Sequence, residues 1–368
     1  MVTLTRRTAT VSLAATIGLA ATSIAGVAAP AAAHHASRAS RSIHAGKSHT
    51  IPGRVSPLAI ACAPGHPVTH QTCHAVVQAS NSSAFLTPVV KGKPKSSPPA
   101  ATGGIDVACP STTKCLVVGS VNQQPTMEWF NGNTLSKTVT VHGANYLQGV
   151  ACSSGSRCVA VGYTTVGGAA KGVFIPVKAS SSTVTAKKVA GVTGLQDVSC
   201  PTATCVAVGS TGPGTSVGAA ITIKGKRAKV HKAHGTTQLA AVSCGSASTC
   251  WAIGFAQTSK GVTTKILKLK SGKPGASKRA PQFGDHLACT TSTTCYLLTA
   301  TSQYGKGKVE RFSGGRAKGS TTLAKFHYGA PDGIACPTKS SCIVTGLFSF
   351  HNPGASFYYI GGVASLTV

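Results

Sequence analysis

Acidic side chains are almost absent from this chain of 368 residues, which has 6 Asp and Glu against 35 Lys and Arg and a formal net charge of +29 at pH 7. Aromatic residues make up only 5% of the sequence and charged residues only 11%, whereas hydrophobic residues make up 42%. Such a low charge content combined with so many apolar residues excludes a disordered chain. The shortage of aromatics predicts a core of small and β-branched side chains, which suit many short strands better than long helices.

Long amphipathic helices are also missing, which argues against a TIM barrel. The chain contains no H-E-x-x-H zinc signature and no P-loop. The few carboxylates leave little choice of acid and base for glycoside hydrolysis. We therefore predict no catalytic residue and no cofactor, and we expect the protein not to be an enzyme.

A long uncharged segment occurs near the N-terminus. The pair Arg6–Arg7 precedes the uncharged residues 10–29, and Ala31–Ala33 supplies small residues for cleavage. We expect residues 1–33 to be a signal peptide cleaved near Ala33, in preference to a transmembrane anchor. The double arginine keeps the twin-arginine route open beside Sec export. After cleavage we expect no transmembrane segment, and a monomer that is secreted, extracellular or attached to the cell wall.

The rest of the chain is dominated by an internal repeat. The segment V-A-C-P-S-T-T-K-C-L-V-V-G begins at Val107, and related copies begin at Ile60, Val150, Val198, Val242, Leu287 and Ile334. The first cysteines of successive copies are 47, 43, 48, 44, 45 and 47 residues apart, the length of a four-stranded propeller blade. Residues 58–368 are therefore predicted to form a seven-bladed all-β propeller, after a flexible His-, Ser- and Arg-rich leader at 34–57. A linear β-solenoid, which does not close into a ring, is the alternative.

All 14 cysteines lie in these copies, two in each. In an exported chain this predicts one disulfide per repeat, across the hairpin of the first two strands. Zinc binding in a reducing compartment is the alternative for such pairs. The predicted disulfides are Cys62–Cys73, Cys109–Cys115, Cys152–Cys158, Cys200–Cys205, Cys244–Cys250, Cys289–Cys295 and Cys336–Cys342.

The copy that contains Cys200 illustrates the expected blade. Its predicted strands are Leu195–Cys200, Cys205–Gly209, Ala219–Lys224 and Ala228–Lys232. Lysines collect in the third and fourth strands, which predicts buried inner strands and solvated outer edges. The Pro-rich residues 91–103 leave the outer part of the first blade uncertain, and strands near Ser356–Ile360 and Val363–Val368 are expected to complete the last blade.

The V-S-C-P-S…C-V-A-V-G pattern resembles that of secreted bacterial β-propeller proteins, many of which have no assigned activity. Those proteins often carry E-x-W-x-G-x-x-W on their outer strands, and Glu128–Gly132 and Glu310–Gly314 match its first half. The resemblance covers about residues 58–368 and implies the fold and export. It implies no particular activity, because propellers host many unrelated functions.

Four of the six acids occupy nearly the same phase of the repeat, three or four residues before the first cysteine: Asp106, Asp197, Asp285 and Asp332. In a closed ring this phase converges on one rim of the central channel, where a ring of carboxylates would hold a cation. Turn chemistry, or pairing with a nearby lysine, is the simpler interpretation.

Three histidines spaced by four, His66, His70 and His74, surround the enlarged first cysteine loop. On a helix they would share one face suited to zinc or copper. Pro64 and Pro67 argue against a helix there, so these residues are weak candidates for a metal site.

The densest basic run comprises Lys224, Lys226, Arg227, Lys229 and Lys232. On a blade edge it would bind polyanions in a salt-dependent way, and a merely solvated strand is the alternative. No interleaved aromatics are present for base stacking, which argues against specific nucleic-acid recognition. We expect a secreted non-enzymatic binding or scaffold protein that contacts anionic polymers or an envelope protein. The alternative is an extracellular propeller hydrolase or lyase acting on polysaccharide or lipid-linked substrates.

Overall fold

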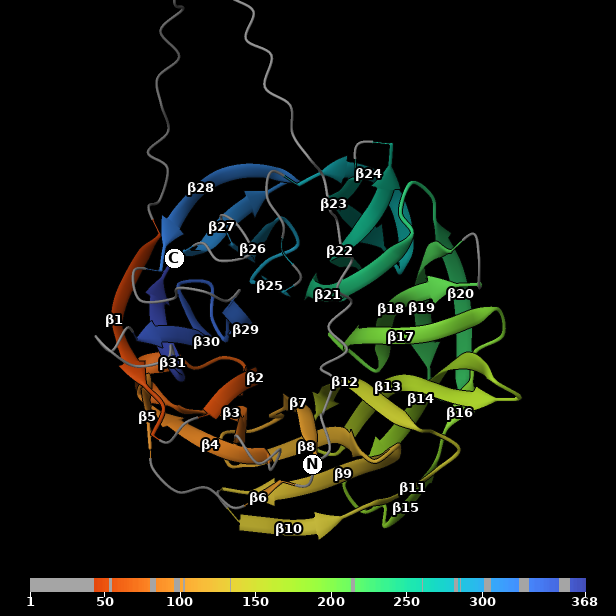
Figure 1. Ribbon diagram of the computed structural model, residues 1–368, viewed down its shortest axis with the longest axis horizontal. Helices are drawn as coiled ribbons and strands as arrows, with labels where there is room; N and C mark the ends of the chain where they lie inside the picture. The colour runs from red at the N-terminus through yellow and green to blue at the C-terminus, as the bar shows by residue number, and fades with distance from the viewer. Residues whose placement is uncertain are drawn as a thin grey trace, which may run out of the picture. The chain divides into compact units, whose positions relative to one another are not determined.

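The computed structural model describes residues 43–368, with gaps at 53–54, 80–83, 96–99, 102, 133, 213–215, 260, 281–283, 285, 301–305, 324–330 and 351–357. Seven antiparallel sheets surround a central axis as the blades of a propeller (Figure 1). Each blade contains one disulfide, and the pairs are the seven that were predicted. The predicted fold class is confirmed, and the sheets form a ring rather than a linear solenoid.

We number the blades 1 to 7 in the order of their first cysteines. The inner strands are β2 (Val55–Cys62), β7 (Gly104–Ala108), β12 (Tyr146–Ser154), β17 (Val192–Ser199), β21 (Gln238–Ser246), β25 (His286–Cys289) and β29 (Pro331–Ala335). The second strands are β3 (Thr72–Ala79), β8 (Lys114–Val121), β13 (Arg157–Val166), β18 (Thr204–Thr211), β22 (Thr249–Thr258), β26 (Thr294–Ala300) and β30 (Ser341–Phe350).

The third strands are β4 (Ala84–Val90), β9 (Gln124–Asn131), β14 (Ala169–Lys178), β19 (Val217–Lys224), β23 (Gly261–Lys270), β27 (Gly307–Ser313) and β31 (Tyr358–Thr367). The outer strands are β5 (Lys93–Pro94) with β6 (Ala100–Ala101), β10 (Thr134–Thr138), β16 (Lys187–Lys188), β20 (Arg227–Ala233), β24 (Lys273–Arg279), β28 (Arg316–Thr322) and β1 (His44–Thr50). A short parallel ribbon joins β11 (Thr140–His142) to β15 (Thr183–Thr185), and a 3-10 turn, η1, spans Val68–His70.

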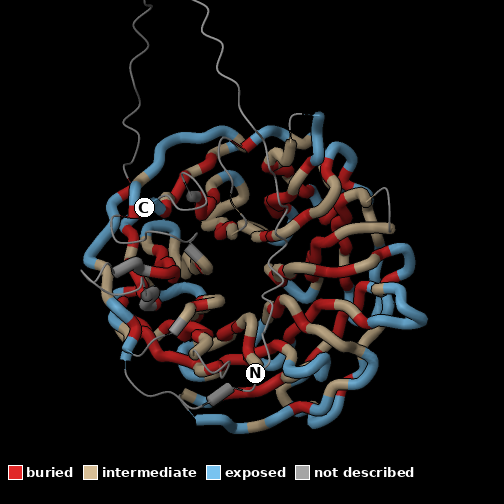
Figure 2. Tube along the Cα trace, in the orientation of Figure 1, coloured by how far each residue is buried: buried red, intermediate tan, exposed pale blue. Residues whose placement is uncertain are grey.

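The strands expected in blade 4 agree with β17 to β20 to within three residues at each end. The second strand, β18, has five consecutive buried residues because it lies between two blades and is covered on both faces. The outer strand β20 is exposed along most of its length and holds the lysines. Figure 2 shows the same gradient around the ring, with buried segments inside the blades and exposed segments at the periphery.

The hydrophobic core is divided into seven layers, one between each pair of neighbouring blades. In six of these layers, the apolar residue after the second cysteine of one blade packs beside the disulfide of the next blade. These six residues are Leu116, Val159, Val206, Trp251, Tyr296 and Ile343. Each disulfide therefore closes its own hairpin and also fills the interface with its neighbour.

The ring is closed by pairing the two ends of the chain. Strand β1 pairs antiparallel with β31, so the outer strand of blade 7 comes from the N-terminal side (Figure 1). This finding corrects the expectation of a flexible leader up to residue 57, because residues 44–50 are a strand. Ile43 and Ile51 flank β1 and are buried in the layers on either side of blade 7. Two C-terminal strands were expected for the last blade, whereas the structure has the single strand β31 in their place.

The predicted signal peptide at 1–33 lies outside the described residues. Within the part of the chain that is described, no helix has the length and apolar character to cross a membrane.

Removing residues 1–50 tests whether β1 closes the ring. Truncation deletes the strand paired with β31 and the buried Ile43, which together should cost about 5 kcal/mol or more in the free energy of unfolding. We expect the melting midpoint, followed by circular dichroism, to fall by about 10 °C or more. The control is truncation of residues 1–42, which leaves β1 intact; equal midpoints for the two truncated proteins would contradict closure by β1.

Candidate functional site

A cavity of about 280 Å³ lies where the inner strands of the blades meet. Its wall comes from the positions two to four residues before the first cysteine of each repeat. The polar residues in this wall are Asp106, Asp197, Asp332, Gln148, Gln196 and His286. Three of the four acids predicted at the channel rim therefore line one cavity, and the fourth, Asp285, lies outside the described residues.

Two of these carboxylates link neighbouring blades. Asp106 of blade 2 accepts a hydrogen bond of 2.8 Å from the backbone N–H of Val150 in blade 3. Asp197 of blade 4 accepts one of 2.7 Å at Oδ2 from Val242 in blade 5, while its Oδ1 accepts another of 2.7 Å from Val198. These acids thus hold adjacent inner strands together, a role that neither the cation-ring interpretation nor the turn interpretation had included.

In blade 3 the position equivalent to Asp106 and Asp197 is occupied by Gly149. A Cβ on Gly149 would lie 3.1 Å from the Cα atom of Asp197 and 3.2 Å from the carbonyl oxygen of Gln196. A side chain at this position would require blade 4 to move by a few tenths of an ångström, so the close approach of the two blades favours glycine there.

Burial raises the pKa of Asp106 to about 6 and that of Asp197 to about 7. The negative charge of Asp106 raises the pKa of Asp197 further, and the backbone hydrogen bonds partly oppose the shift in both residues. Because the two carboxyls interact, ionisation of one disfavours ionisation of the other. The cavity therefore gains negative charge in steps as the pH rises toward neutrality.

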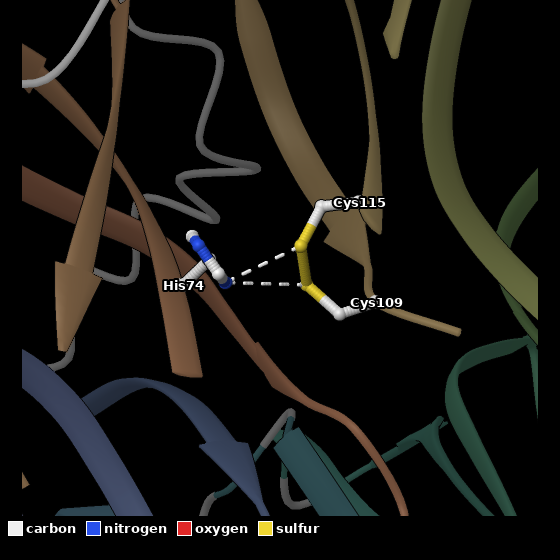
Figure 3. Close-up of side chains that lie close together, drawn as sticks. All are labelled: His74, Cys109 and Cys115. Atoms are coloured by element: carbon white, nitrogen blue, oxygen red, sulfur yellow. Dashed lines mark hydrogen bonds between the residues drawn. A yellow bond between two sulfur atoms is a disulfide. The ribbon is translucent and has the colours of Figure 1, made fainter. Parts of the chain in front are cut away.

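The three predicted metal-binding histidines do not form one site. His66 and His70 are exposed in the loop of blade 1, whereas His74 is buried in β3. His74 faces the disulfide of blade 2, and its Nδ1 lies 3.3 Å from Sγ of Cys115 and 3.8 Å from Sγ of Cys109 (Figure 3). Burial lowers the pKa of His74 to about 4, so the imidazole is neutral at physiological pH.

A basic groove lies between blades 3 and 4. Two adjoining hollows of about 720 and 660 Å³ share Ala186, Lys187 and Lys226 in their walls. None of the described residues that line them is acidic. We call this feature the interblade groove, and its basic side chains are Arg157, Lys178, Lys187, Lys188, Lys224 and Lys226.

The predicted polyanion-binding run is divided between two sides of blade 4. Lys224 and Lys226 line the interblade groove. The other three members, which are exposed on β20, are Arg227, Lys229 and Lys232. His231, on the same strand, faces blade 5, because partial burial and the positive charges of Lys229 and of Lys273 in blade 5 lower its pKa. The run therefore contributes only in part to the groove.

Four of the six basic residues of the groove were not among the predicted site residues, because they come from blade 3. A signal for one of them is present in the sequence: Lys178 ends the third strand of blade 3 as Lys224 ends that of blade 4. Arg157 precedes the second cysteine of blade 3 as Lys114 precedes that of blade 2, whereas Lys187 and Lys188 have no such repeated position. Only the docking of the two blades brings them to the same groove.

No protein-family model matches the chain, and no curated protein matches it either. A protein of unknown function from Dyadobacter fermentans DSM 18053 is similar in structure, with a TM-score of 0.51 at 10% identity, over 89% of this chain and 100% of that chain. A subtype N11 neuraminidase-like protein of flat-faced bat origin (H18N11) has a TM-score of 0.49 at 10% identity, over 88% of this chain and 93% of that chain. At such low identity the first likeness extends to the fold alone, and the second carries no argument.

An Asp197→Asn variant tests the protonation of the cavity carboxyls. The folded pKa of about 7 exceeds the ordinary 3.8, so the folded chain keeps a proton that the unfolded chain has released. This carboxyl therefore contributes stability at low pH that is lost as the pH rises through 7. Between pH 4 and 8 the wild type should lose on the order of 2–4 kcal/mol of unfolding free energy that the variant does not lose.

The measurement is urea unfolding of both proteins across this pH range. Gln196→Asn, a neutral change in the same wall, is the control and should shift stability equally at every pH. Parallel pH profiles for the wild type and Asp197→Asn would show that this carboxyl ionises normally in the folded protein.

Proposed function

We propose that this protein is a secreted, non-enzymatic binding or scaffold protein that contacts anionic polymers of the cell envelope or extracellular matrix through the interblade groove. The observation that carries the proposal is the convergence of six cationic side chains from two blades on one groove without an acidic residue in its described lining. These six side chains come from separate parts of the sequence, so the docking of two blades gathers them in one groove.

The chemistry of the groove suits a repeating anion. Ser153, Ser181 and Thr183 contribute hydroxyls beside the lysines, and these groups hydrogen-bond to phosphate, carboxylate or sugar oxygens. One exposed lysine contributes little to affinity, because solvent and salt screen it. Several cations contacting successive charges of one polymer act together, so the binding is expected to be multivalent and salt-dependent.

Export belongs to the same proposal. Seven disulfides without a free cysteine are typical of proteins that fold in an oxidising compartment. A signal peptide at residues 1–33 would deliver the chain to such a compartment. The ligand would then be a polymer of the wall, membrane surface or matrix.

The alternative function is an extracellular hydrolase or lyase with its carboxyls in the central cavity. Asp106 and Asp197 both accept hydrogen bonds from the backbone of the next blade. This linking role accounts for their position and burial without requiring chemistry. We therefore place the function in the interblade groove.

A triple variant, Lys178→Gln, Lys224→Gln and Lys226→Gln, tests the groove. We expect its affinity for poly(glycerol phosphate) at about 50 mM salt to be at least about fivefold weaker than that of the wild type, because three adjacent cations are lost. Biolayer interferometry at low and high salt would measure both affinity and salt dependence. Repeating the measurement with a polyuronate would show whether the groove binds phosphate or carboxylate polymers more tightly.

The matched control is Lys270→Gln, Lys273→Gln and Lys318→Gln, which removes the same charge from the third and outer strands of blade 5 and the outer strand of blade 6. This protein should retain most of its affinity. Equal weakening in the two triple variants would mean that net charge, and not the groove, determines binding.

A further inference from the structure

The position after the second cysteine of each blade follows a rule with one exception. Six blades place Leu, Val, Val, Trp, Tyr or Ile there, buried against the disulfide of the next blade. Blade 1 places His74 there, and its side chain is only 1% exposed. A histidine at this position loses hydration without adding a packing advantage over leucine or valine.

The surroundings of His74 do not satisfy its imidazole. Nδ1 points at the two sulfurs of the Cys109–Cys115 disulfide (Figure 3). Nε2 is buried and has no hydrogen-bond partner among the described residues. Disulfide sulfur is only a weak acceptor, so neither nitrogen has a strong protein partner. The fold alone therefore does not explain why histidine occupies this position.

The same three side chains are the only group of at least three potential metal-ligating residues in the described part of the chain. The Nδ1 atom of His74 and the Sγ atoms of Cys109 and Cys115 all lie within 4.8 Å of one another. While the disulfide is intact its sulfurs are poor ligands, because metals bind the thiolate. The group becomes a ligand set only when the disulfide is reduced.

We propose that His74, Cys109 and Cys115 bind a thiophilic metal ion, with Zn²⁺ as the reference case, in the reduced form of the Cys109–Cys115 pair. A dithiol or phosphine reductant supplies two electrons, two protons are taken up, and the S–S bond is replaced by two thiols. Binding of the metal displaces the thiol protons and forms two metal–sulfur bonds and one metal–nitrogen bond. This site is independent of the interblade groove.

The geometry suits this ligand set. In a tetrahedral zinc site with bonds of about 2.3 Å to sulfur and about 2.0 Å to nitrogen, sulfur and nitrogen ligands are about 3.5 Å apart. Nδ1 of His74 already lies 3.3 and 3.8 Å from the two sulfurs. Only the two sulfurs have to separate, to about 3.8 Å, and breaking their bond allows this movement.

The site would also join two blades. His74 lies on β3 of blade 1, whereas both cysteines flank the first hairpin of blade 2. A metal bound there would link blades 1 and 2, which the disulfide within blade 2 does not do. In the other six interfaces the equivalent residue offers neither a nitrogen nor a sulfur ligand.

The test is a titration of the reduced, folded full-length protein with Co²⁺, whose thiolate charge-transfer band reports coordination, followed by displacement with Zn²⁺. We expect the wild type to take up one equivalent more than His74→Leu under the same conditions. Leucine is the matched substitution, because Leu116 occupies this position in blade 2. In the oxidised state His74→Leu should melt at least as high as the wild type, since a buried unpartnered nitrogen is removed.

The control for the other thiols is the double variant Cys152→Ser and Cys158→Ser, which removes the disulfide that packs on Leu116. It should keep the additional equivalent of Co²⁺. Equal uptake by reduced wild type and His74→Leu would overturn the proposal, as would loss of the additional equivalent in this control.

A second variant avoids reduction of the whole protein. Cys109→Ser leaves the Cys115 thiol beside His74 while the other six disulfides remain closed. In competition with a chromophoric Cu⁺ chelator, this protein should bind Cu⁺ at least about tenfold more tightly than the same variant carrying His74→Leu. Equal affinities would overturn the proposal even if full reduction unfolds the chain.

Discussion

The contact between the disulfide of one blade and the residue after the second cysteine of the preceding blade determines the architecture of this propeller. The sequence contains few aromatic residues, so small side chains must fill most of the space between its blades. Disulfide sulfurs and aliphatic residues do so, together with six buried aromatics: Trp129, Phe130, Phe174, Trp251, Tyr296 and Phe312. Each bridge closes a short loop and therefore adds only local stability by chain entropy, but its sulfurs also form part of the next interface. Packing within and between blades thus depends on the same atoms.

This arrangement separates charge across the molecule. The inner and second strands contribute their side chains to the interblade layers, where an unpaired charge would be strongly destabilising. Most lysines lie in the third and outer strands or in turns, with Lys114 at the start of β8 as an exception, and six basic side chains of blades 3 and 4 line the interblade groove. Two of the acidic residues, unlike the lysines, lie on the inner wall of the ring. Asp106 and Asp197 remain on the inner wall because backbone N–H groups of the next blade satisfy them and burial keeps them partly protonated near neutral pH.

The features that repeat could be predicted from the sequence, and the features that depend on closing the ring could not. Seven cysteine pairs at a blade-length period were enough to predict the blades, the disulfides and the strands of blade 4. The strand β1 has the sequence HAGKSHT, without apolar alternation, and it is a strand because β31 offers an unpaired edge and Ile43 and Ile51 anchor its ends. The meeting of Arg157 and Lys178 with Lys224 likewise needs the docking of two blades, which no local pattern encodes.

In a repeat protein, the positions that deviate from the repeat are the most informative about function. A residue shared by all blades is explained by the need to build a blade, so it says little about what the protein does. His74 replaces an apolar residue at a position that six other blades keep apolar, and blade packing does not require the change. The basic lining between blades 3 and 4 is a second deviation, since Lys187 and Lys188 have no repeated counterparts. Asp106 and Asp197 deviate as well, but their hydrogen bonds to the next blade give them a structural reason. The comparison among equivalent positions therefore separates the acids, which the ring explains, from His74 and the groove, which it does not.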